Sequence, residues 1–438
     1  MSEAKENKKP LYRFVRTPFA RSTGASLISI LIGILCGFLI MLICASFANA
    51  DPGEGFALLL AGPFSSKRYA ASQFGTMLFY TGPLILTGLS VAVAYKTGLF
   101  NIGAPGQFLM GTLGSLLVAL SINTTGNRGL GILVWLLAIL VGIVLGILWA
   151  LIPGALKAFF GINEVITCIM TNWIAANIVT WVFSARPDLM NTGAGKTGYL
   201  IQPSVTGNYT PTLGLDRLFH SGTYNSYLDM GLILAVLLAV LMWFILNKTT
   251  LGYSMKACGY NKEAARYAGM KHRFYIMVAM GIAGGLAALA GSLYYLNPNI
   301  ELQWQSVYQE LPSYGFDGIP AAFLANCNPT GVIFAALFIR YLSASGTFLQ
   351  KAGYNKYFAD LIIAVIVYLS GFARFFRERI ERTQGIRDKL GVSYFGYIGW
   401  KCKRFGAKFQ GCFSSKKQKE ETTTTKPSDS QSEEGGKK

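Results

Sequence analysis

The stretch "YKTGLFNIGAPGQFLMGTLG" (residues 95–114) places a polar, glycine-rich segment between two long apolar runs. The run before it is "GTMLFYTGPLILTGLSVAVA", and the run after it is "FLMGTLGSLLVALSI". Irregular backbone at membrane depth is tolerated only where it is buried in protein or lines a water-filled cavity. The stretch therefore predicts membrane helices with a break that faces protein or a cavity.

The composition of the whole chain agrees with a membrane protein. The 438 residues are 52% hydrophobic and 14% charged, with a mean hydropathy of +0.40. Soluble domains usually contain about 25% charged residues. Apolar blocks of about 20 residues recur, which is long enough for a helix to cross a bilayer. We expect an all-α, polytopic membrane helical bundle of about ten segments, including a broken helical pair.

The broken pair is predicted from "GFDGIPAAFLANCNPTG" (residues 315–331), where Asn328-Pro329 is a strong turn signal. If a short helix enters the membrane from one side and the next helix returns after the turn, the final segment leaves both chain ends on the same side of the membrane. The expected membrane segments are 25–47, 75–95, 99–122, 130–152, 163–184, 228–247, 274–296, 317–326 with 329–346, and 357–373.

The formal net charge of +18 is unevenly distributed. Basic residues concentrate in the segment 1–24, the loop 248–273 and the tail 374–438, on either side of and within a transmembrane domain 25–373. Cytoplasmic loops carry an excess of Lys and Arg, so both termini are expected in the cytoplasm of a multi-pass cell-membrane protein. The pattern favours membrane lipid over nucleic acid as the partner of these bases. The polar tail is expected to be disordered after about residue 413.

Several chemistries are disfavoured. The seven cysteines are scattered without CxxC spacing, and the chain has two histidines, so no metal site and no catalytic residues are expected. The segment "GAGKT" (residues 193–197) lacks the first glycine of a phosphate-binding loop, because Met190 occupies that position.

The inner loop contains "NKEAARYAG" (residues 261–269), which predicts a short amphipathic helix. Such a helix can dock into a groove on another protein, and it can equally be a solvated connector. The residues proposed for docking are Asn261, Glu263, Ala264, Ala265, Arg266, Tyr267 and Gly269.

Four segments together resemble the integral-membrane permeases of ATP-binding-cassette importers. "GYSMKACGYNKEAARYAGM" resembles their coupling loop, and "TGLFNIGAPGQFLMG" resembles the "FNIGAEGQ" signature of the nucleoside and simple-sugar, ribose-type branch. "GINEVITCIMTNWIA" and "GFDGIPAAFLANCNPTG" are similar to two further segments of that branch. One departure is Pro105, where the family usually has a glutamate, and this leaves the choice between nucleosides and sugars open.

The resemblance implies a permease for nucleosides, with simple sugars as the alternative. It also implies a second permease subunit, expected to be a different protein, together with separate ATPase subunits and an extracytoplasmic substrate-binding lipoprotein. The chain itself would be neither an enzyme nor a cofactor carrier, since the partner subunits hydrolyse ATP. An ion-coupled secondary transporter and a structural or lipid-binding membrane protein remain as other classes.

Polar residues inside apolar segments are the candidates for a substrate path. Amides donate and accept hydrogen bonds without a charge to desolvate, which suits an uncharged, hydroxyl-rich ligand. The alternative is that they satisfy backbone groups at turns or bond neighbouring helices. The path candidates are Asn101, Gln107, Asn172, Trp173, Asn177 and Asp317, with Gly103, Pro105, Gly106 and Pro329 as predicted helix breaks. Glu164 follows Asn163 at a predicted helix start, so a capping role competes with a pathway role.

Overall fold

The structure, a computed structural model, describes residues 18–48, 50–124, 127–189, 196–197, 208–222, 224–355 and 357–370. Residues Ser26–Phe372 form one compact unit, and the description below concerns this unit. Most of the predicted basic segment 1–24 and all of the predicted tail 374–438 lie outside the described residues.

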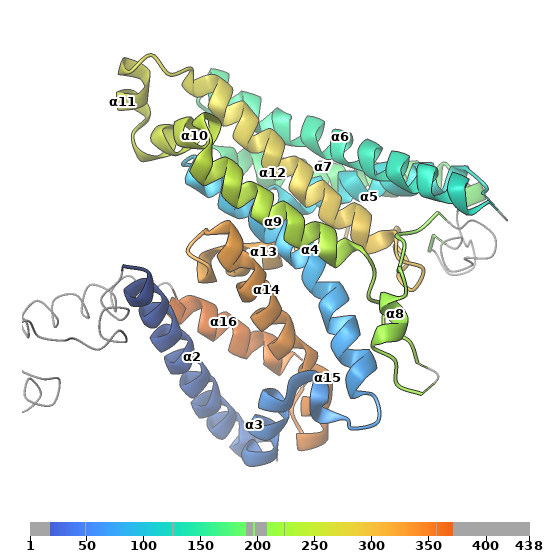
Figure 1. Cartoon of the computed structure of the whole chain (residues 1–438). Coiled ribbons are helices and arrows are strands. Elements are labelled where there is room, and N and C mark those ends of the chain that lie inside the picture. The colour runs from blue at the N-terminus through green and yellow to red at the C-terminus, as the bar shows by residue number, and fades with distance from the viewer. Residues whose placement is uncertain are drawn as a thin grey trace, which may run out of the picture. The chain divides into compact units, whose positions relative to one another are not determined.

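The described residues form helices joined by short turns and loops (Figure 1). Their regular elements contain no strand, and one isolated β-bridge joins Ser221 and Tyr224. The all-α prediction is therefore confirmed. The longer helices are α2 (Pro18–Ala48), α3 (Pro52–Ala61), α4 (Ala70–Lys96), α5 (Ala104–Ser121), α6 (Arg128–Phe160), α7 (Glu164–Ser184), α9 (Gly231–Lys248), α10 (Thr250–Tyr260), α12 (His272–Tyr295), α13 (Ser313–Leu324), α14 (Pro329–Ala344) and α16 (Phe358–Ser370). The shorter ones are η1 (Gly62–Ser65), η2 (Pro187–Leu189), α8 (Leu215–Leu218), α11 (Lys262–Tyr267), α15 (Gly346–Leu349) and η4 (Gln350–Ala352).

Each predicted membrane segment corresponds to a helix. In the described part of the chain, seven helical segments are long and apolar enough to cross a membrane by themselves. α13, with 12 residues, and α16, with 13, are shorter. The broken pair is real, because the chain turns between α13 and α14 through Asn326 and Cys327, which both have positive φ angles.

Small residues allow the central helices α5, α6 and α12 to pack closely. A Cβ added to Gly111 of α5 would lie 2.2 Å from the carbonyl oxygen of Ala288 in α12. A Cβ added to Gly146 of α6 would lie 2.1 Å from the Ala288 Cβ. Close backbone approach through glycine and alanine is how membrane helices gain van der Waals contact without a hydrophobic driving force.

Contacts along α4 establish the direction of the broken pair. Gly318 of α13 packs on Thr87, and the turn residue Asn326 accepts a hydrogen bond from Lys96 Nζ at the end of α4 (3.4 Å). α14 then returns, because the Tyr341 hydroxyl donates to the carbonyl of Leu60, which precedes α4 (2.7 Å). The pair is thus a hairpin that runs along α4 toward its C-terminal end and comes back.

Helices α2 and α16 pack against each other in opposite directions. Gly33 lies against Ile366, and Gly37, one turn later in α2, lies against Ile362, one turn earlier in α16. The two ends of the compact unit therefore lie at the same end of the bundle.

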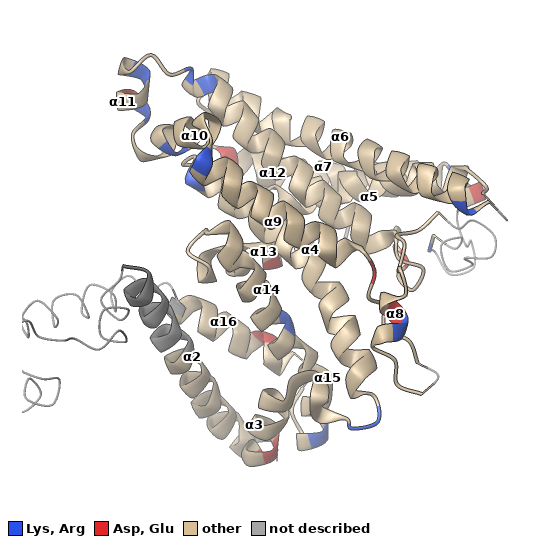
Figure 2. Ribbon diagram, in the orientation of Figure 1, with Lys and Arg blue, Asp and Glu red and all other residues tan. Residues whose placement is uncertain are grey.

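That end also carries a concentration of positive charge. Lys and Arg gather around α10 and α11 in Figure 2, including Lys248, Lys256, Lys262, Arg266, Lys271 and Arg273. Few charged residues lie within the long helices, and one of them is Arg340 of α14. We call the end of the unit with α11 the coupling end, and the end with the start of α4 the opposite end.

Candidate functional site

The polar stretch between α4 and α5 folds back into the bundle. The non-helical backbone is confined to residues 97–103, with Gly98 in the left-handed region (φ 75°). The prediction that Pro105 and Gly106 break a helix is wrong, because both lie in the first turn of α5. Proline is well tolerated there, since the first turn leaves its N–H positions without intrahelical partners. Gly103 precedes α5 as its N-cap residue, and Pro329 is the first residue of α14.

Asn101 is the centre of what we call the amide cluster, which consists of Ser90, Asn101, Gln107 and Asn172. Asn101 Nδ2 donates to Ser90 Oγ (3.0 Å) and to Gln107 Oε1 (2.8 Å). Asn101 Oδ1 accepts from Gln107 Nε2 (3.1 Å) and from the backbone N–H of Gly103 (3.1 Å). Asn101 is 0% exposed, so both N–H groups and both lone pairs of its amide are used inside the protein.

Asn172 connects the amide cluster to α7. Its Oδ1 accepts from the backbone N–H of Gly106 (2.9 Å), and its Nδ2 donates to the carbonyl of Ile102 (3.0 Å). A Cβ added to Gly106 would lie 2.7 Å from Asn172 Oδ1, so the glycine lets the two helices meet. The amide cluster holds the start of α5 between α4 and α7.

Trp173 and Asn177 lie on a different face of α7 from Asn172. Both side chains are exposed in the isolated chain, and Asn177 Nδ2 donates to the carbonyl of Trp173 (2.8 Å). Trp181 continues this face and is 71% exposed. The structure therefore separates Asn172 from the two candidates that the sequence grouped with it.

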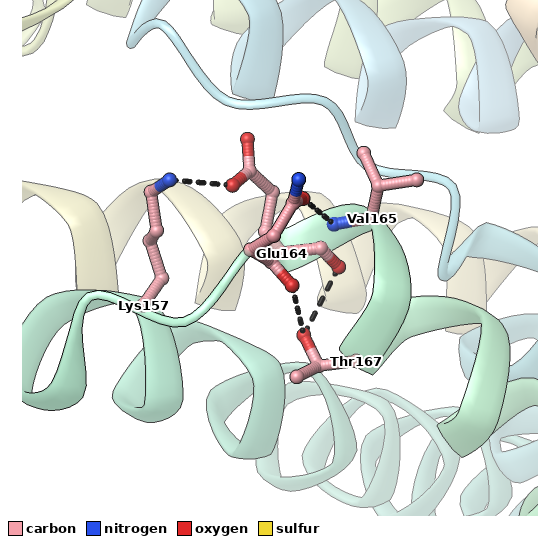
Figure 3. Close-up of polar contacts among 5 residues, drawn as sticks. Lys157, Glu164, Val165 and Thr167 are labelled. Carbon is pink, nitrogen blue, oxygen red and sulfur yellow. Dashed lines mark hydrogen bonds and ion pairs between the residues drawn. The ribbon is translucent and has the colours of Figure 1, made fainter.

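Glu164 opens α7 at the coupling end (Figure 3). Asn163 caps the helix, its Oδ1 accepting from the backbone N–H of Val165 (2.9 Å). The Glu164 carboxylate forms an ion pair with Lys157 of α6 (2.7 Å). The backbone carbonyl of Glu164 accepts a hydrogen bond from the Thr167 hydroxyl (3.0 Å). These contacts close the turn between α6 and α7. Glu164 also borders a hollow of about 450 Å³ that is lined by Lys96 and Lys256.

Asp317 forms part of a second polar region. Its Oδ2 accepts from Arg340 Nη2 of α14 (3.1 Å), so the ion pair joins the two halves of the broken pair. The Arg340 side chain is 13% exposed and that of Asp317 is 38% exposed. The Arg340 guanidinium lies 4.3 Å from the centre of the Tyr314 ring, within the range of a cation–π contact.

Arg340 lines a pocket of about 510 Å³ between α4, α14 and the loop before α9. We call it the tyrosine pocket and define it by Gln73, Tyr80, Tyr227, Tyr314, Arg340 and Thr347. The Tyr80 ring centre is 6.3 Å from that of Tyr314 and 6.5 Å from that of Tyr227. The Tyr80 and Tyr314 rings are tilted by 33°, and the Tyr80 and Tyr227 rings meet edge to face at 72°.

Two residues of the tyrosine pocket each have a buried polar atom that lacks a hydrogen-bond partner. In the described part of the chain, four buried side-chain nitrogen or oxygen atoms have none: Gln73 Oε1, Arg340 Nε, Trp149 Nε1 and Trp304 Nε1. The first two belong to residues that line the pocket. The sequence interpretation did not single out Arg340 or the tyrosines, although an arginine inside an apolar span is a signal for function.

The predicted inner-loop helix is α11, which projects from the coupling end in Figure 1. Asn261 caps it by accepting from the backbone N–H of Ala264 (2.9 Å). Tyr267 is 92% exposed, whereas Ala265 is 4% exposed. Ala265 was expected on the docking face, and its burial removes it from that face, since a side chain turned toward its own chain is unavailable to a partner. The other predicted docking residues, namely Asn261, Glu263, Ala264, Arg266, Tyr267 and Gly269, are exposed.

Comparison with known proteins identifies relatives over most of the chain. A family profile described as "Branched-chain amino acid transport system / permease component" matches residues 73–370. The guanosine ABC transporter permease protein NupP of Bacillus subtilis is 34% identical over 342 residues, covering 78% of this chain and 90% of the relative. The nucleoside ABC transporter permease protein NupB of Lactococcus lactis is 34% identical over 371 residues, covering 84% and 95%.

A sugar permease is also among the relatives. The glucose ABC transporter permease protein TsgB13 of Haloferax volcanii is 30% identical over 339 residues, covering 75% of this chain and 83% of the relative. The two bacteria named above each have a second matching permease, NupQ at 27% identity and NupC at 23%. No solved structure matches. These matches and the apolar helices show that the chain is a multi-pass membrane protein.

Proposed function

We propose that this chain, which belongs to the family of permease components of branched-chain amino acid transport systems, is a permease subunit of an ATP-driven importer of nucleosides. The observation that carries the proposal is the 34% identity, over most of both chains, to permeases named for guanosine and nucleoside transport. Simple sugars are the second candidate, because a glucose permease is 30% identical.

The proposed importer contains further subunits. A second, different permease is supported by the pairs of matching permeases in the two bacteria, NupP with NupQ and NupB with NupC. Separate ATPase subunits hydrolyse ATP, so this chain needs neither catalytic residues nor a cofactor. An extracytoplasmic substrate-binding lipoprotein delivers the substrate at the opposite end.

The ATPase subunits dock on α11 in this proposal. The helix projects from the coupling end, and its exposed Tyr267, Arg266 and Ala264 supply an aromatic, a basic and a small contact residue. By the positive-inside rule, the basic residues of this end support a cytoplasmic location for it and for both termini. ATP binding and hydrolysis then shift the permease between two conformations.

Uptake of labelled substrates tests the proposed substrate class. The chain is co-expressed with its partner permease, ATPase and lipoprotein in cells that lack other nucleoside importers. We expect ATP-dependent accumulation of labelled guanosine and uridine that requires this chain and resists an excess of glucose. Accumulation of ribose or glucose without nucleosides would instead favour the sugar function. An ATPase with an inactivated nucleotide site is the control for energy coupling.

Co-purification tests the docking role of α11. Tyr267→Ala removes the most exposed ring of the helix, and we expect less ATPase to co-purify and uptake to fall in proportion. Tyr253→Ala is the matched control, because this ring on α10 is also largely exposed (67%) but lies outside the proposed docking helix. Normal ATPase recovery with Tyr267→Ala would make α11 a connector.

A further inference from the structure

We propose that the hollow of about 450 Å³ at the coupling end binds a phosphate ester, with the phosphate at Lys96 and Lys256 and the organic part of the ligand against the neighbouring aromatic rings. We call it the lysine hollow, and its lining includes Tyr95, Lys96, Phe100, Lys256 and Tyr260. It shares no residue with the amide cluster or the tyrosine pocket, and binding there goes beyond the proposed transport function.

Close backbone contact brings the two lysines from distant segments to the same hollow. Lys96 is the last residue of α4, and Lys256 lies in α10 one turn before Gly259. A Cβ added to Gly259 would lie 2.5 Å from the Lys96 carbonyl oxygen, and one added to Gly98 would lie 3.1 Å from the Gly259 Cα. The two glycines let the end of α4 meet α10, and both lysines therefore line one hollow.

Both ammonium groups are open to solvent and have unused donors. Lys96 Nζ donates to the carbonyl of Asn326 (3.4 Å) and Lys256 Nζ donates to Asn247 Oδ1 (3.2 Å), both in exposed positions. An ammonium group has three N–H donors, so each lysine uses one of them within the described part of the chain. No carboxylate of that part forms an ion pair with either lysine. A phosphate can therefore bind here without breaking an existing ion pair.

The charge of the lysine hollow favours an anion. Among the described residues that line it, Glu164 is the one acid, and its carboxylate is already paired with Lys157 (2.7 Å; Figure 3). Further Lys and Arg residues gather around α10 and α11 (Figure 2). A phosphate monoester carries about −1.5 to −2 charges at pH 7 and three acceptor oxygens, which matches two ammonium groups.

The rest of the lysine hollow suits an organic group of moderate size. Its volume of about 450 Å³ lies within the usual range of small-molecule sites, about 300 to 1,000 Å³. Tyr260 is 90% exposed, so its ring is available to a ligand, and Phe100 adds a partly buried ring. Two sources supply a phosphate next to such a group at a cytoplasmic membrane surface, namely soluble nucleotides and the headgroups of anionic lipids.

A phosphate bound in the lysine hollow would hold α10 against the end of α4. α10 ends at Tyr260, and the next residue, Asn261, caps α11, the proposed docking helix. A ligand stabilises the conformation that it binds better. One that bridges Lys96 and Lys256 should therefore slow a cycle in which α11 moves relative to α4. This regulatory consequence rests on the proposed docking of the ATPase, whereas the binding itself does not.

Binding to the assembled complex tests the site. The complex of this chain with its partner permease and ATPase is placed in phosphatidylcholine nanodiscs, and labelled guanosine monophosphate is titrated. The double variant Lys96→Gln with Lys256→Gln identifies the binding that belongs to the lysine hollow, because the ATPase and the partner are unchanged in it. We expect the affinity of this site to fall about 10-fold or more, through two lost charge-assisted contacts.

The matched control is Lys248→Gln with Lys271→Gln, which removes the same charge from exposed positions of the coupling end outside the lysine hollow. It should bind as the wild type does. An equal loss of affinity in this control would assign the effect to the general positive charge of the surface and would overturn the site.

A second measurement distinguishes the two sources of the phosphate. In nanodiscs that also contain phosphatidylglycerol, native mass spectrometry counts the anionic lipids that stay with the complex. More of this lipid on the wild type than on the lysine double variant would assign the hollow to a lipid headgroup. A difference with guanosine monophosphate alone would assign it to a soluble nucleotide. If neither ligand distinguishes the two proteins, the proposal is wrong.

Tyr260 separates the organic part of the ligand from its phosphate. Tyr260→Ala should weaken binding of guanosine monophosphate about 5-fold or more and leave the affinity for inorganic phosphate unchanged. Tyr260→Phe keeps the ring and should bind nearly as the wild type. Tyr253→Ala is the control, because this exposed ring of α10 does not line the hollow. An equal loss of inorganic phosphate in Tyr260→Ala would contradict a contact between the ring and the ligand.

ATP hydrolysis by the complex tests the regulatory consequence. The bound phosphate ester should lower the rate of the wild type, and it should not lower that of the lysine double variant, whose rate without ligand should equal the wild-type rate. Binding without this difference would overturn the regulation. A complex that imports sugars instead of nucleosides would contradict the proposed function and leave these expectations for the lysine hollow unchanged.

Discussion

The amide cluster and the tyrosine pocket both consist of polar side chains between apolar helices, but they use their hydrogen-bonding groups differently. In the amide cluster, every group of the Asn101 amide has a partner within the chain, and the residue is fully buried. In the tyrosine pocket, Gln73 and Arg340 each keep a buried atom without a partner beside a cavity. The satisfied groups of the amide cluster indicate an architectural role, whereas the tyrosine pocket is a hollow between helices whose lining includes Gln73 and Arg340.

This comparison changes the interpretation of Asn101 that its sequence context allowed. From the sequence, Asn101 could either line a substrate path or hold together the turn between α4 and α5. Its contacts with Ser90, Gln107 and the Gly103 backbone favour the turn. In a membrane interior these backbone and side-chain groups cannot turn to water, so satisfying them within the protein stabilises the re-entrant segment.

The largest expected effect comes from Asn101→Leu. The change leaves the Gln107 amide, the Ser90 hydroxyl and the Gly103 N–H without partners. Each buried unsatisfied group costs about 1–3 kcal/mol, which sums to a large part of the stability of a protein. We expect the yield of detergent-stable complex to collapse, as measured by fluorescence-detected gel filtration.

The control for this variant is Asn177→Leu, which removes an exposed amide on α7. It should leave the yield near the wild-type value. If Asn101→Leu instead assembles normally and only weakens uptake, the amide cluster lines the path and the comparison fails.

A medium effect is expected where the buried starts of α5 and α13 meet. A Cβ added to Gly315 of α13 would lie 2.4 Å from Pro105 Cα of α5, so Gly315→Ala must displace backbone. Overpacking of this kind costs about 1–3 kcal/mol. We therefore expect a lower melting temperature of the complex in detergent.

Gly281→Ala is the matched control in α12, since its added Cβ would meet its nearest neighbours at 3.7 Å, an ordinary contact. It should leave the melting temperature unchanged. A normal melting temperature in Gly315→Ala would show that the contact between α5 and α13 is looser than the geometry indicates.

The smallest expected effect concerns Asp229, a buried acid with hydrogen-bond partners inside the chain. It tests whether such hydrogen bonds are enough to keep the pKa of a buried carboxyl at its usual value. Asp229, in the loop before α9, accepts from the Gly231 N–H (2.8 Å) and from Asn297 Nδ2 (2.9 Å). Burial nevertheless raises the pKa of Asp229 to about 7. The raised pKa means that the folded state holds the proton more tightly than the unfolded state does. This contribution to stability is therefore complete at low pH and is lost as the pH rises through 7.

Between pH 6 and 8 we expect a loss of about 1 kcal/mol, which a thermal melt of the detergent complex would detect. Asp229→Asn cannot titrate and should flatten this dependence. An equally steep pH dependence in the variant would assign it to other groups.

Much of the fold could be predicted from the sequence because its signals are local. Apolar runs of membrane-spanning length marked most of the long helices, and Asn328-Pro329 marked the turn of the broken pair. The details at the start of α5 were harder, because a proline and a glycine break a helix in its interior but are accommodated in its first turn.

The candidate site was less predictable, since helical position decides what a side chain meets. Asn172 and Asn177 are five residues apart, which places them about 140° apart around α7. One is buried in the amide cluster and the other is exposed. On α11, Ala265 is likewise buried whereas Tyr267, two residues later, is exposed.

The sequence by itself determined that this is a helical membrane permease with interrupted apolar segments, because hydropathy, charge distribution and the four signature segments are readable along the chain. Only the tertiary structure decided which polar groups are satisfied. Asn101 finds its partners close by, but Arg340 meets Asp317 across the turn of the broken pair, and Gln73 reaches the same pocket from α4. Whether a buried polar atom has a partner depends on contacts between helices distant in sequence, and no local pattern encodes them.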